Sequence, residues 1–129
     1  TVVSRTNKHE DLGSLIRALK PERWKVLQAL PVTGQNSAHA GEFEVKAWEF
    51  EGFLARHANL KDITAIVPEP VDAITGSYLM IDPAGRFYDD VQGWHRYSRP
   101  VLEVGLEAAL EDVVFDQAKF VERGGKYAY

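Results

Sequence analysis

The stretch PERWKVLQ, residues 21–28, contains a helix stop followed at once by the start of a strand, and this junction decides how the first part of the chain is built. Pro21 restricts the residue before it to extended conformations, so an apolar helix that precedes it must end there. The residues after Pro21 alternate, which places Trp24 and Val26 on one face of a strand. We therefore expect a strand over residues 23–32 that packs a core with this face.

The opposite face of the same strand carries two cations, Arg23 and Lys25. Because they are two residues apart, their side chains lie on one face, about 6.6 Å apart along the strand. Two neighbouring cations repel each other unless water or an anion compensates them. Two interpretations stay open: a solvated strand edge, which is the ordinary position of charged side chains, or a site for an anionic ligand.

The helix before this strand has a clear apolar stripe. Asn7 and Glu10 have the spacing of a capping box, in which side chains satisfy free N–H groups of the first helical turn. The stripe itself consists of Leu12, Leu15, Ile16 and Leu19. This spacing of i, i+3, i+4 and i+7 predicts one buried helix face.

The remainder of the chain mixes short strands with helices. Residues 82–85, Asp-Pro-Ala-Gly, are typical of a hairpin turn, because proline sets φ and glycine accepts a positive φ. We expect short strands at residues 43–45, 63–67, 77–82 and 86–88, and helices at residues 50–57, at residues 102–113, and from Asp116 to a glycine cap at 124–125. This order of elements predicts a mixed α/β or α+β class.

Composition narrows the possible functions. The 129 residues are 45% hydrophobic and 26% charged, as in an ordinary globular domain, and no run approaches the ~20 apolar residues of a membrane helix. We expect a soluble, cytoplasmic protein. The net charge of −4 argues against a general nucleic-acid binder. The absence of cysteine excludes disulfides, a catalytic thiol and thiolate-ligated metal within this chain.

Metal ligation by other residues and hydrolytic chemistry find little support. The four histidines, at positions 9, 39, 57 and 95, include no His-x-x-x-His pair. We expect His57, on a helix face, to be a packed or solvated residue rather than a ligand. No Gly-x-Ser-x-Gly elbow supports a nucleophilic serine.

A second basic segment is Arg123-Gly124-Gly125-Lys126-Tyr127. Its glycines would let backbone N–H groups approach a phosphate, and the flanking cations would supply charge. The same glycines equally suit a helix C-cap, with the cations near the negative end of the helix dipole. Taken together with the first cation pair, in an acidic chain, this segment points to a polyphosphate ligand.

Three other polar positions are candidates for site residues, and two of them have ordinary explanations. We expect Tyr78, at the start of an apolar strand, to pack its ring with the hydroxyl at the rim. Glu69 lies between two prolines, in a stiff extended segment that could aim its carboxylate at a ligand. Asp89 and Asp90 are expected to be a solvated loop pair rather than an acid/base dyad.

Five separated blocks, in order through nearly the whole chain, carry a resemblance to a known family. They are PERWKVLQ (21–28), VPE (67–69), SYLMID (77–82), VGLEAA (104–109) and RGGKY (123–127). With these blocks the chain resembles the C-terminal part of the viperin family, antiviral radical S-adenosylmethionine enzymes. The resemblance implies the end of a partial (β/α) TIM-like radical SAM barrel at residues 1–33, followed by an α+β extension at residues 34–129 that closes over the nucleotide.

The resemblance also implies a reaction, that of a nucleotide dehydratase, which is a lyase. Enzymes of this family use a [4Fe–4S] cluster to cleave S-adenosylmethionine, and the resulting 5′-deoxyadenosyl radical takes the 4′ hydrogen of a ribonucleoside triphosphate. Loss of the 3′-hydroxyl as water then gives a 3′-deoxy-3′,4′-didehydro nucleotide. The base, which would be that of CTP, UTP or GTP, is left open. Such chemistry belongs mainly to the cofactors, while protein groups hold the sugar in place.

Particular residues receive roles from the resemblance. Arg23 and Lys25 would bind the triphosphate, in agreement with the paired-cation argument. Tyr78 would be the catalytic residue, facing the ribose as a hydrogen donor, and Glu69 would lie near the base. The closing segment that binds the triphosphate would consist of Arg123, Gly124, Gly125 and Lys126.

The chain departs from the family in ways that restrict this reading. The cluster motif Cys-x-x-x-Cys-x-x-Cys is absent, and Thr1 is followed by Val2-Val3 without an initiator methionine. We expect a fragment or subunit that is inactive alone, with the cluster and S-adenosylmethionine bound mainly by a missing N-terminal half in the same or a separate chain. A non-catalytic nucleotide-binding or regulatory module is the alternative, and plain structural packing is a third possibility.

Overall fold

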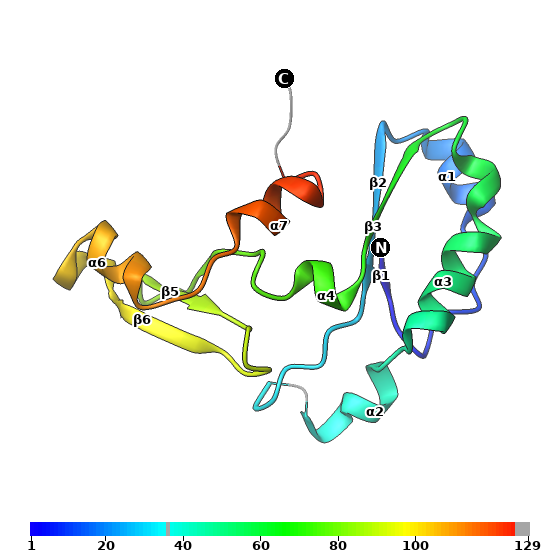
Figure 1. Cartoon of the computed structure of the whole chain (residues 1–129). Helices are drawn as coiled ribbons and strands as arrows, with labels where there is room; N and C mark the ends of the chain where they lie inside the picture. Colours follow the sequence, from blue (N-terminus) through cyan, green and yellow to red (C-terminus); the bar gives the residue numbers. More distant parts are fainter. Residues whose placement is uncertain (36, 126–129) are drawn as a thin grey trace. The chain divides into compact units, whose positions relative to one another are not determined.

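The computed structural model describes residues 1–35 and 37–125, which form two compact units. The first unit comprises Thr1–Leu30 and His39–Val71; the second comprises Pro31–Ala38 and the chain from Asp72 onward. Each unit contains one three-stranded sheet (Figure 1). The predicted mixed α/β class is confirmed, while the division between residues 33 and 34 stays a prediction.

The first unit is built on a parallel sheet in the order β1-β2-β3. Its strands are β1 (Val2–Val3), β2 (Arg23–Gln28) and β3 (Ala65–Glu69). Parallel neighbours require crossover connections, and these contain α1 (Gly13–Leu19) and α3 (Ala47–Arg56). Figure 1 shows both helices on the same side of the three strands, so one face of the sheet is covered by helices. Two short helical segments, α2 (Ala40–Phe43) and η2 (Ala58–Leu60), complete the unit's connections, while η1 (Ser37–His39) spans the boundary between the two units in the sequence.

The core of the first unit lies between this sheet face and the helices. As predicted, β2 alternates, with Trp24 and Val26 buried and their neighbours half-buried. The indole of Trp24 meets the ring of Phe53 on α3 edge-on, with the ring centroids 6.2 Å apart. The buried cluster consists of Val3, Ile16, Trp24, Val26, Val45, Phe50, Phe53 and Leu60. Each of these large side chains contributes about 1.5–3 kcal/mol through the apolar surface that it buries.

The predicted start of the first helix is wrong. The Oδ1 of Asn7 accepts from the N–H of Ser4 at 2.7 Å, so this side chain stabilises a turn and does not cap a helix. The helix begins at Gly13, whose N–H donates to the carboxylate of Asp11 at 2.8 Å. Local side-chain bonds of Asn and Asp compete with helix formation, which is why the capping pattern misleads here.

Two other predictions in the first unit need correction. The strand predicted over residues 23–32 ends at Gln28, where its pairing with β1 also ends. The strand predicted at residues 43–45 is absent, because Ala40–Phe43 forms α2 and Val45 enters the core. The helix predicted at residues 50–57 is confirmed as part of α3.

The second unit contains an antiparallel sheet in the order β4-β5-β6. Its strands are β4 (Met80–Ile81), β5 (Arg86–Asp89) and β6 (Arg96–Pro100). The predicted hairpin turn is confirmed, since the N–H of Gly85 donates to the carbonyl of Asp82 at 2.9 Å and Gly85 has φ of 71°. A positive φ of this kind explains why glycine occupies the last position of the turn.

Four short helices accompany this sheet: α4 (Val71–Ile74), α5 (Val101–Val104), α6 (Leu106–Glu111) and α7 (Gln117–Glu122). The single helix predicted over residues 102–113 is wrong, because Gly105 has φ of 83° and interrupts it. As a result Leu102 is 97% exposed, whereas Ala109 and Val113 pack with Phe87 in a second core. The predicted last helix is confirmed as α7, with Asp116 as its N-cap.

Asp89 and Asp90 are buried, so their expected position in solvent is wrong. Asp89 accepts from the guanidinium of Arg96 at 2.9 Å and from the N–H of Val114 at 2.9 Å. Asp90 accepts from the N–H of Gly76 at 3.1 Å. Both carboxylates therefore organise the backbone of the second unit.

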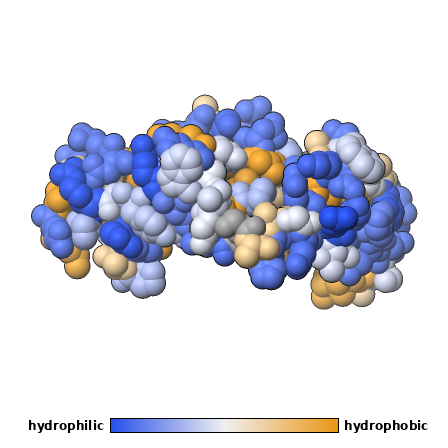
Figure 2. Space-filling model, turned by 90° about the horizontal axis from the view of Figure 1, so that it is seen from below, coloured by the Kyte–Doolittle hydropathy of each residue, from blue (hydrophilic) through white to orange (hydrophobic). Residues whose placement is uncertain are grey.

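The surface is mostly hydrophilic on the face that Figure 2 shows, with apolar residues gathered in separate small patches. Among residues 1–35 and 37–125, no helix has the length and apolar character needed to cross a membrane. The expected cytoplasmic location stays a prediction.

Candidate functional site

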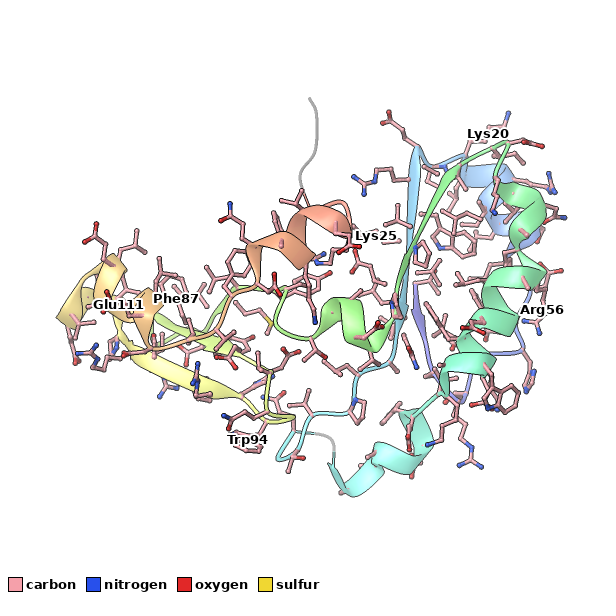
Figure 3. The ribbon with its side chains drawn as sticks, in the orientation of Figure 1. Lys20, Lys25, Arg56, Phe87, Trp94 and Glu111 are labelled. Carbon is pink, nitrogen blue, oxygen red and sulfur yellow. The ribbon has the colours of Figure 1, made fainter. Side chains whose placement is uncertain are left out.

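The half-buried face of β2 carries both predicted triphosphate-binding cations, Arg23 and Lys25. This face is opposite the one that packs against α1 and α3, and Figure 3 shows Lys25 on it. The Nζ of Lys25 lies 2.6 Å from the Oε1 of Glu69 on β3. The side chain of Glu69 is 0% exposed and that of Lys25 is 27% exposed. An anion from the same chain thus compensates one of the two cations.

The register of the parallel sheet explains this ion pair. Leu27 on β2 is the partner of Glu69, and Lys25 lies two residues before Leu27 on the same face. The carboxylate therefore reaches the ammonium diagonally across the two strands. Sequence reasoning singled out both residues but missed their contact, because the only signal for it is the pairing of β2 with β3. A buried carboxylate needs such compensation, since removal from water is costly for an unpaired charge.

Gln28, at the end of β2, bonds to the backbone of two other segments of the first unit. Its side chain is buried, its Nε2 donates to the carbonyl of Val45 at 2.8 Å, and its Oε1 accepts from the N–H of Val71 at 3.1 Å. The second bond holds the backbone just after Glu69. Gln28 was not identified from the sequence as a structural residue. Its position at the end of β2 was the available signal.

In the second unit, the structure brings Tyr78 and Arg123 together. The Cζ of Arg123 lies 3.8 Å from the ring centroid of Tyr78 and 5.1 Å from that of Phe120. One guanidinium nitrogen donates to the carbonyl of Ser77 at 3.0 Å. Arg123 is only 7% exposed, so this cation is enclosed by aromatic rings and backbone. The sequence predicted both residues as site residues but not that they touch.

Gly124 and Gly125 form a helix cap. The N–H of Gly124 donates to the carbonyl of Val121 at 3.0 Å, and the N–H of Gly125 donates to that of Phe120 at 2.8 Å. These two bonds and a φ of 75° at Gly124 define a Schellman motif at the end of α7. The helix-cap interpretation of this segment is confirmed, while its role toward a triphosphate stays a prediction. Lys126, also predicted to bind the triphosphate, lies outside the described residues.

His57 is a packed core residue, which is one of the two positions expected for it. It is 1% exposed, and its ring lies 4.4 Å from that of Phe53, measured between centroids. Its Nε2 accepts from the N–H of Leu12 at 2.9 Å, and its Nδ1 lies 2.8 Å from the carbonyl of Phe53. An acceptor at Nε2 and a donor at Nδ1 require the neutral imidazole with its proton on Nδ1.

The residues present do not fit an iron–sulfur cluster. The chain has no cysteine, and the described residues include no group of three or more His, Asp or Glu that could hold a metal ion. The roles predicted for Arg23, Lys25 and Glu69 in nucleotide binding, and for Tyr78 in catalysis, stay predictions.

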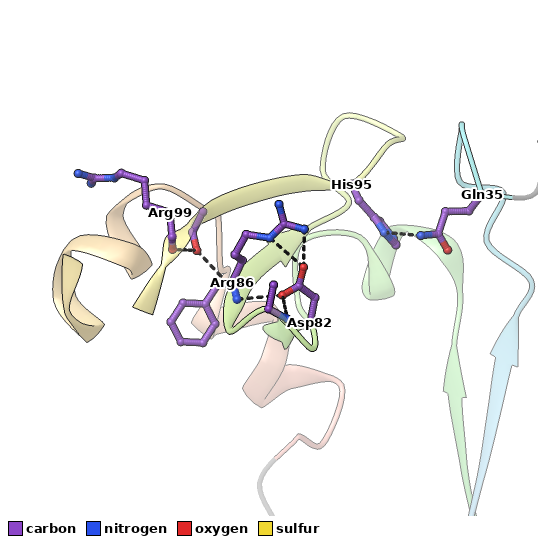
Figure 4. A network of polar contacts seen from close by, with 8 residues as sticks. Gln35, Asp82, Arg86, His95 and Arg99 are labelled. Atoms are coloured by element: carbon purple, nitrogen blue, oxygen red, sulfur yellow. Dashed lines mark hydrogen bonds and ion pairs between the residues drawn. The ribbon is translucent and has the colours of Figure 1, made fainter. Parts of the chain in front are cut away.

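Two surface ion pairs shift carboxyl pKa values in the second unit. Hydrogen bonds from the guanidinium of Arg86, at 2.9 and 2.6 Å, lower the pKa of the Asp82 carboxyl (Figure 4). The bidentate guanidinium of Arg99, at 2.8 and 3.0 Å, likewise lowers the pKa of Asp112. Carboxylates held in the ionised form by arginine are structural here and are poor candidates for general acids.

Comparison with known proteins shows what this chain is similar to. No protein-family model matches it. It is 49% identical over 127 residues to an S-adenosylmethionine-dependent nucleotide dehydratase of Lacinutrix mariniflava, a match covering 98% of the chain and 26% of that relative. A protein of the same name from Flammeovirga pacifica is 40% identical over 129 residues, covering 100% of the chain and 43% of the relative. The S-adenosylmethionine-dependent nucleotide dehydratase RSAD2 of Danio rerio is 37% identical over 134 aligned positions, covering 100% of the chain and 36% of the relative.

These similarities confirm the resemblance found in the sequence blocks. Over nearly its whole length the chain is similar to viperin-like S-adenosylmethionine-dependent nucleotide dehydratases. It spans only 26 to 43% of the length of the three relatives described above.

Proposed function

We propose that this chain is the C-terminal, nucleotide-binding part of a viperin-like radical SAM enzyme that dehydrates a ribonucleoside triphosphate for antiviral defence. The observation that carries the proposal is the similarity to nucleotide dehydratases over 98 to 100% of the chain. The parallel β-α architecture of the first unit is compatible with the end of a (β/α) radical SAM barrel, which forms part of the same proposal.

The first unit would supply charge for the triphosphate. Arg23 and Lys25 share a face of β2, and a pair of cations at fixed spacing suits a polyphosphate. Glu69 would orient the Lys25 ammonium through their 2.6 Å contact, so that this cation is in place before the nucleotide arrives. Glu69 would also lie near the base, at the end of a strand that Gln28 holds in position.

The second unit would supply Tyr78, facing the ribose. The segment that contains Arg123, Gly124 and Gly125, together with Lys126, would close over the nucleotide. The [4Fe–4S] cluster and S-adenosylmethionine would be bound mainly outside this chain, because it has no cysteine and residues 1–35 and 37–125 include no group that could hold a metal ion. The chain's own contribution would therefore be to bind and orient the nucleotide.

The reaction can be tested in the complete protein that contains this chain. Cluster-loaded protein would be incubated with S-adenosylmethionine, a reductant and CTP, UTP or GTP in turn, and the products analysed by mass spectrometry. We expect one triphosphate to lose the mass of water and to yield the 3′-deoxy-3′,4′-didehydro analogue. A protein that binds the triphosphates but converts none of them would support the alternative, a non-catalytic nucleotide-binding or regulatory module.

A test of Lys25 needs a control for folding, because removing its ammonium also takes away the positive charge that compensates the buried Glu69 carboxylate. Nucleotide affinity would be measured for Lys25→Met, Glu69→Gln and the double variant. We expect the double variant to recover most of the stability that Lys25→Met loses, yet to keep its weakened triphosphate binding. Recovery of affinity along with stability in the double variant would contradict a direct role of Lys25 in binding the phosphates.

A further inference from the structure

We infer that Arg123 is a positioning residue for Tyr78: its guanidinium holds the phenol ring in the orientation in which Tyr78 faces the ribose. This inference rests on the proposed function, which gives Tyr78 its place beside the sugar. The role that it gives Arg123 differs from phosphate binding. All the contacts that support this role lie within the second unit.

The first of these contacts is the stacking itself. The Cζ of Arg123 lies 3.8 Å from the ring centroid of Tyr78, well inside the distance at which a cation is attracted to an aromatic face. The same guanidinium donates at 3.0 Å to the carbonyl of Ser77, the residue just before Tyr78, and Ser77 is 0% exposed. Arg123 therefore contacts both the ring and the backbone that leads to it, and a tyrosine held at both points has little freedom to turn.

A second set of contacts ties the helix that bears Arg123 to the segment that bears Tyr78. The N–H of Asp116 donates to the carbonyl of Gly76 at 2.8 Å. The Nζ of Lys119 donates to the carbonyl of Asp72 at 2.9 Å. Helix α7 thus contacts this segment at its start, its middle and its end, so movement of the helix would be passed to the tyrosine.

The glycine pair after Arg123 fixes the arginine in turn. A Cβ built on Gly125 would lie 2.5 Å from the carbonyl oxygen of Phe120 and 2.5 Å from its ring, so only glycine fits against Phe120. The ring of Phe120 lies 5.1 Å from the Cζ of Arg123, on α7 itself. The close approach of Gly125 therefore holds Phe120 in place, and the ring of Phe120 is one of the two rings that the guanidinium of Arg123 lies near. On this reading the Arg-Gly-Gly sequence specifies a rigid support for Tyr78.

The kinetic test uses the complete, cluster-loaded protein with Arg123→Gln and Arg123→Lys, and Glu122→Gln on the exposed face of α7 as the control. We expect Arg123→Gln to lower the yield of dehydrated nucleotide per S-adenosylmethionine cleaved about tenfold. Arg123→Lys, which keeps a cation above the ring, should recover part of that yield, and the control should match the wild type. An unchanged yield per S-adenosylmethionine cleaved in Arg123→Gln, with only nucleotide affinity weakened, would overturn the positioning role and leave Arg123 a phosphate ligand.

A spectroscopic test separates failure of this inference from failure of the proposed function. In protein labelled with ¹⁵N-arginine, protons of the Arg123 guanidinium above the Tyr78 ring should resonate upfield. Tyr78→Leu should abolish that shift, while Tyr78→Phe, which keeps the ring, should preserve it. Equal shifts in the wild type and Tyr78→Leu would overturn the inference whatever the protein's activity. If the upfield shift is present but the Tyr78→Phe variant dehydrates the nucleotide at the wild-type rate, the stacking of Arg123 on Tyr78 is supported. The catalytic role of Tyr78, and the positioning role of Arg123 that depends on it, would then be contradicted.

Discussion

The ammonium of Lys25 lies 2.6 Å from the carboxylate of Glu69, and the two partners are very unequally exposed. Glu69 is fully enclosed, whereas about a quarter of the Lys25 side chain meets solvent (27%). A partly exposed ammonium can regain water when its partner is removed, but an enclosed carboxylate cannot. The pair should therefore respond asymmetrically to substitution.

We predict that Lys25→Met lowers the free energy of unfolding by about 3 kcal/mol, because the enclosed carboxylate loses its ammonium. Glu69→Gln should cost only about 1 kcal/mol, since the remaining lysine is partly solvated and glutamine keeps the shape of the site. Urea denaturation of both variants would measure the difference. Equal losses, or a larger loss for Glu69→Gln, would show that the burial of the carboxylate does not control the energetics of the pair.

His57 provides a second test of the first unit. Its Nε2 accepts from the N–H of Leu12 at the start of α1, and its Nδ1 contacts the carbonyl of Phe53, so His57→Phe keeps an aromatic ring but removes both polar contacts. We expect a loss of about 1–3 kcal/mol in the free energy of unfolding. His39→Gln is the control, because its side chain is 64% exposed and should change stability little. If His57→Phe matched this control, the two polar contacts would contribute nothing.

Some local patterns predicted local structure correctly, although the capping pattern at Asn7 and Glu10 did not. The alternation of β2 placed Trp24 and Val26 in the core, because a strand's two-residue period can be read directly from the sequence. The turn at residues 82–85 was also predictable, since its proline and glycine set the backbone angles themselves. Asp116 as the N-cap of α7 follows from the same kind of short-range chemistry.

Contacts between segments far apart in sequence were not predictable in this way. Lys25 contacts Glu69 because of the register between β2 and β3. Arg123 contacts Tyr78 because α7 is hydrogen-bonded to the segment of residues 72–78. The break at Gly105 was missed for a different reason, because the apolar spacing on either side of it fits one helix. That glycine, inside an otherwise helical pattern, was the available signal.

The Asp82–Arg86 pair predicts a dependence of stability on pH. Arg86 lowers the pKa of Asp82 in the folded chain, whereas the unfolded chain keeps the ordinary value near 3.8. The stabilisation is therefore present above that ordinary value and is lost as the pH falls through the lowered one. We expect Asp82→Asn to reduce the melting temperature at pH 7 and to approach the wild type at pH 2.5.

Thermal denaturation of both proteins between pH 7 and pH 2.5 would measure this convergence. Asp62→Asn, at an exposed position, is the matched control and should run parallel to the wild type at every pH. Added salt should shrink the difference at pH 7, because the side chain of Arg86 is 39% exposed and charges that meet solvent are screened. A difference between Asp82→Asn and wild type that grows in acid would have the wrong sign and would contradict the role given to Arg86.

The glycine cap of α7 allows a prediction in which the effects of three glycine-to-alanine substitutions on stability are ranked. Gly124→Ala places a side chain at φ of 75° and should cost about 1 kcal/mol, the ordinary penalty for a left-handed alanine. Gly125→Ala should cost more, about 2 kcal/mol, because its Cβ meets the Phe120 carbonyl and ring at 2.5 Å and must displace them. Gly52→Ala, in the interior of α3 with nothing within 4 Å of a Cβ, should instead stabilise by about 1 kcal/mol. Urea denaturation of the three variants should give this order, and the Arg123 resonance should shift in Gly125→Ala, because Phe120 moves. A Gly125→Ala protein as stable as Gly52→Ala would show that the cap does not hold Phe120, and with it Arg123, in place.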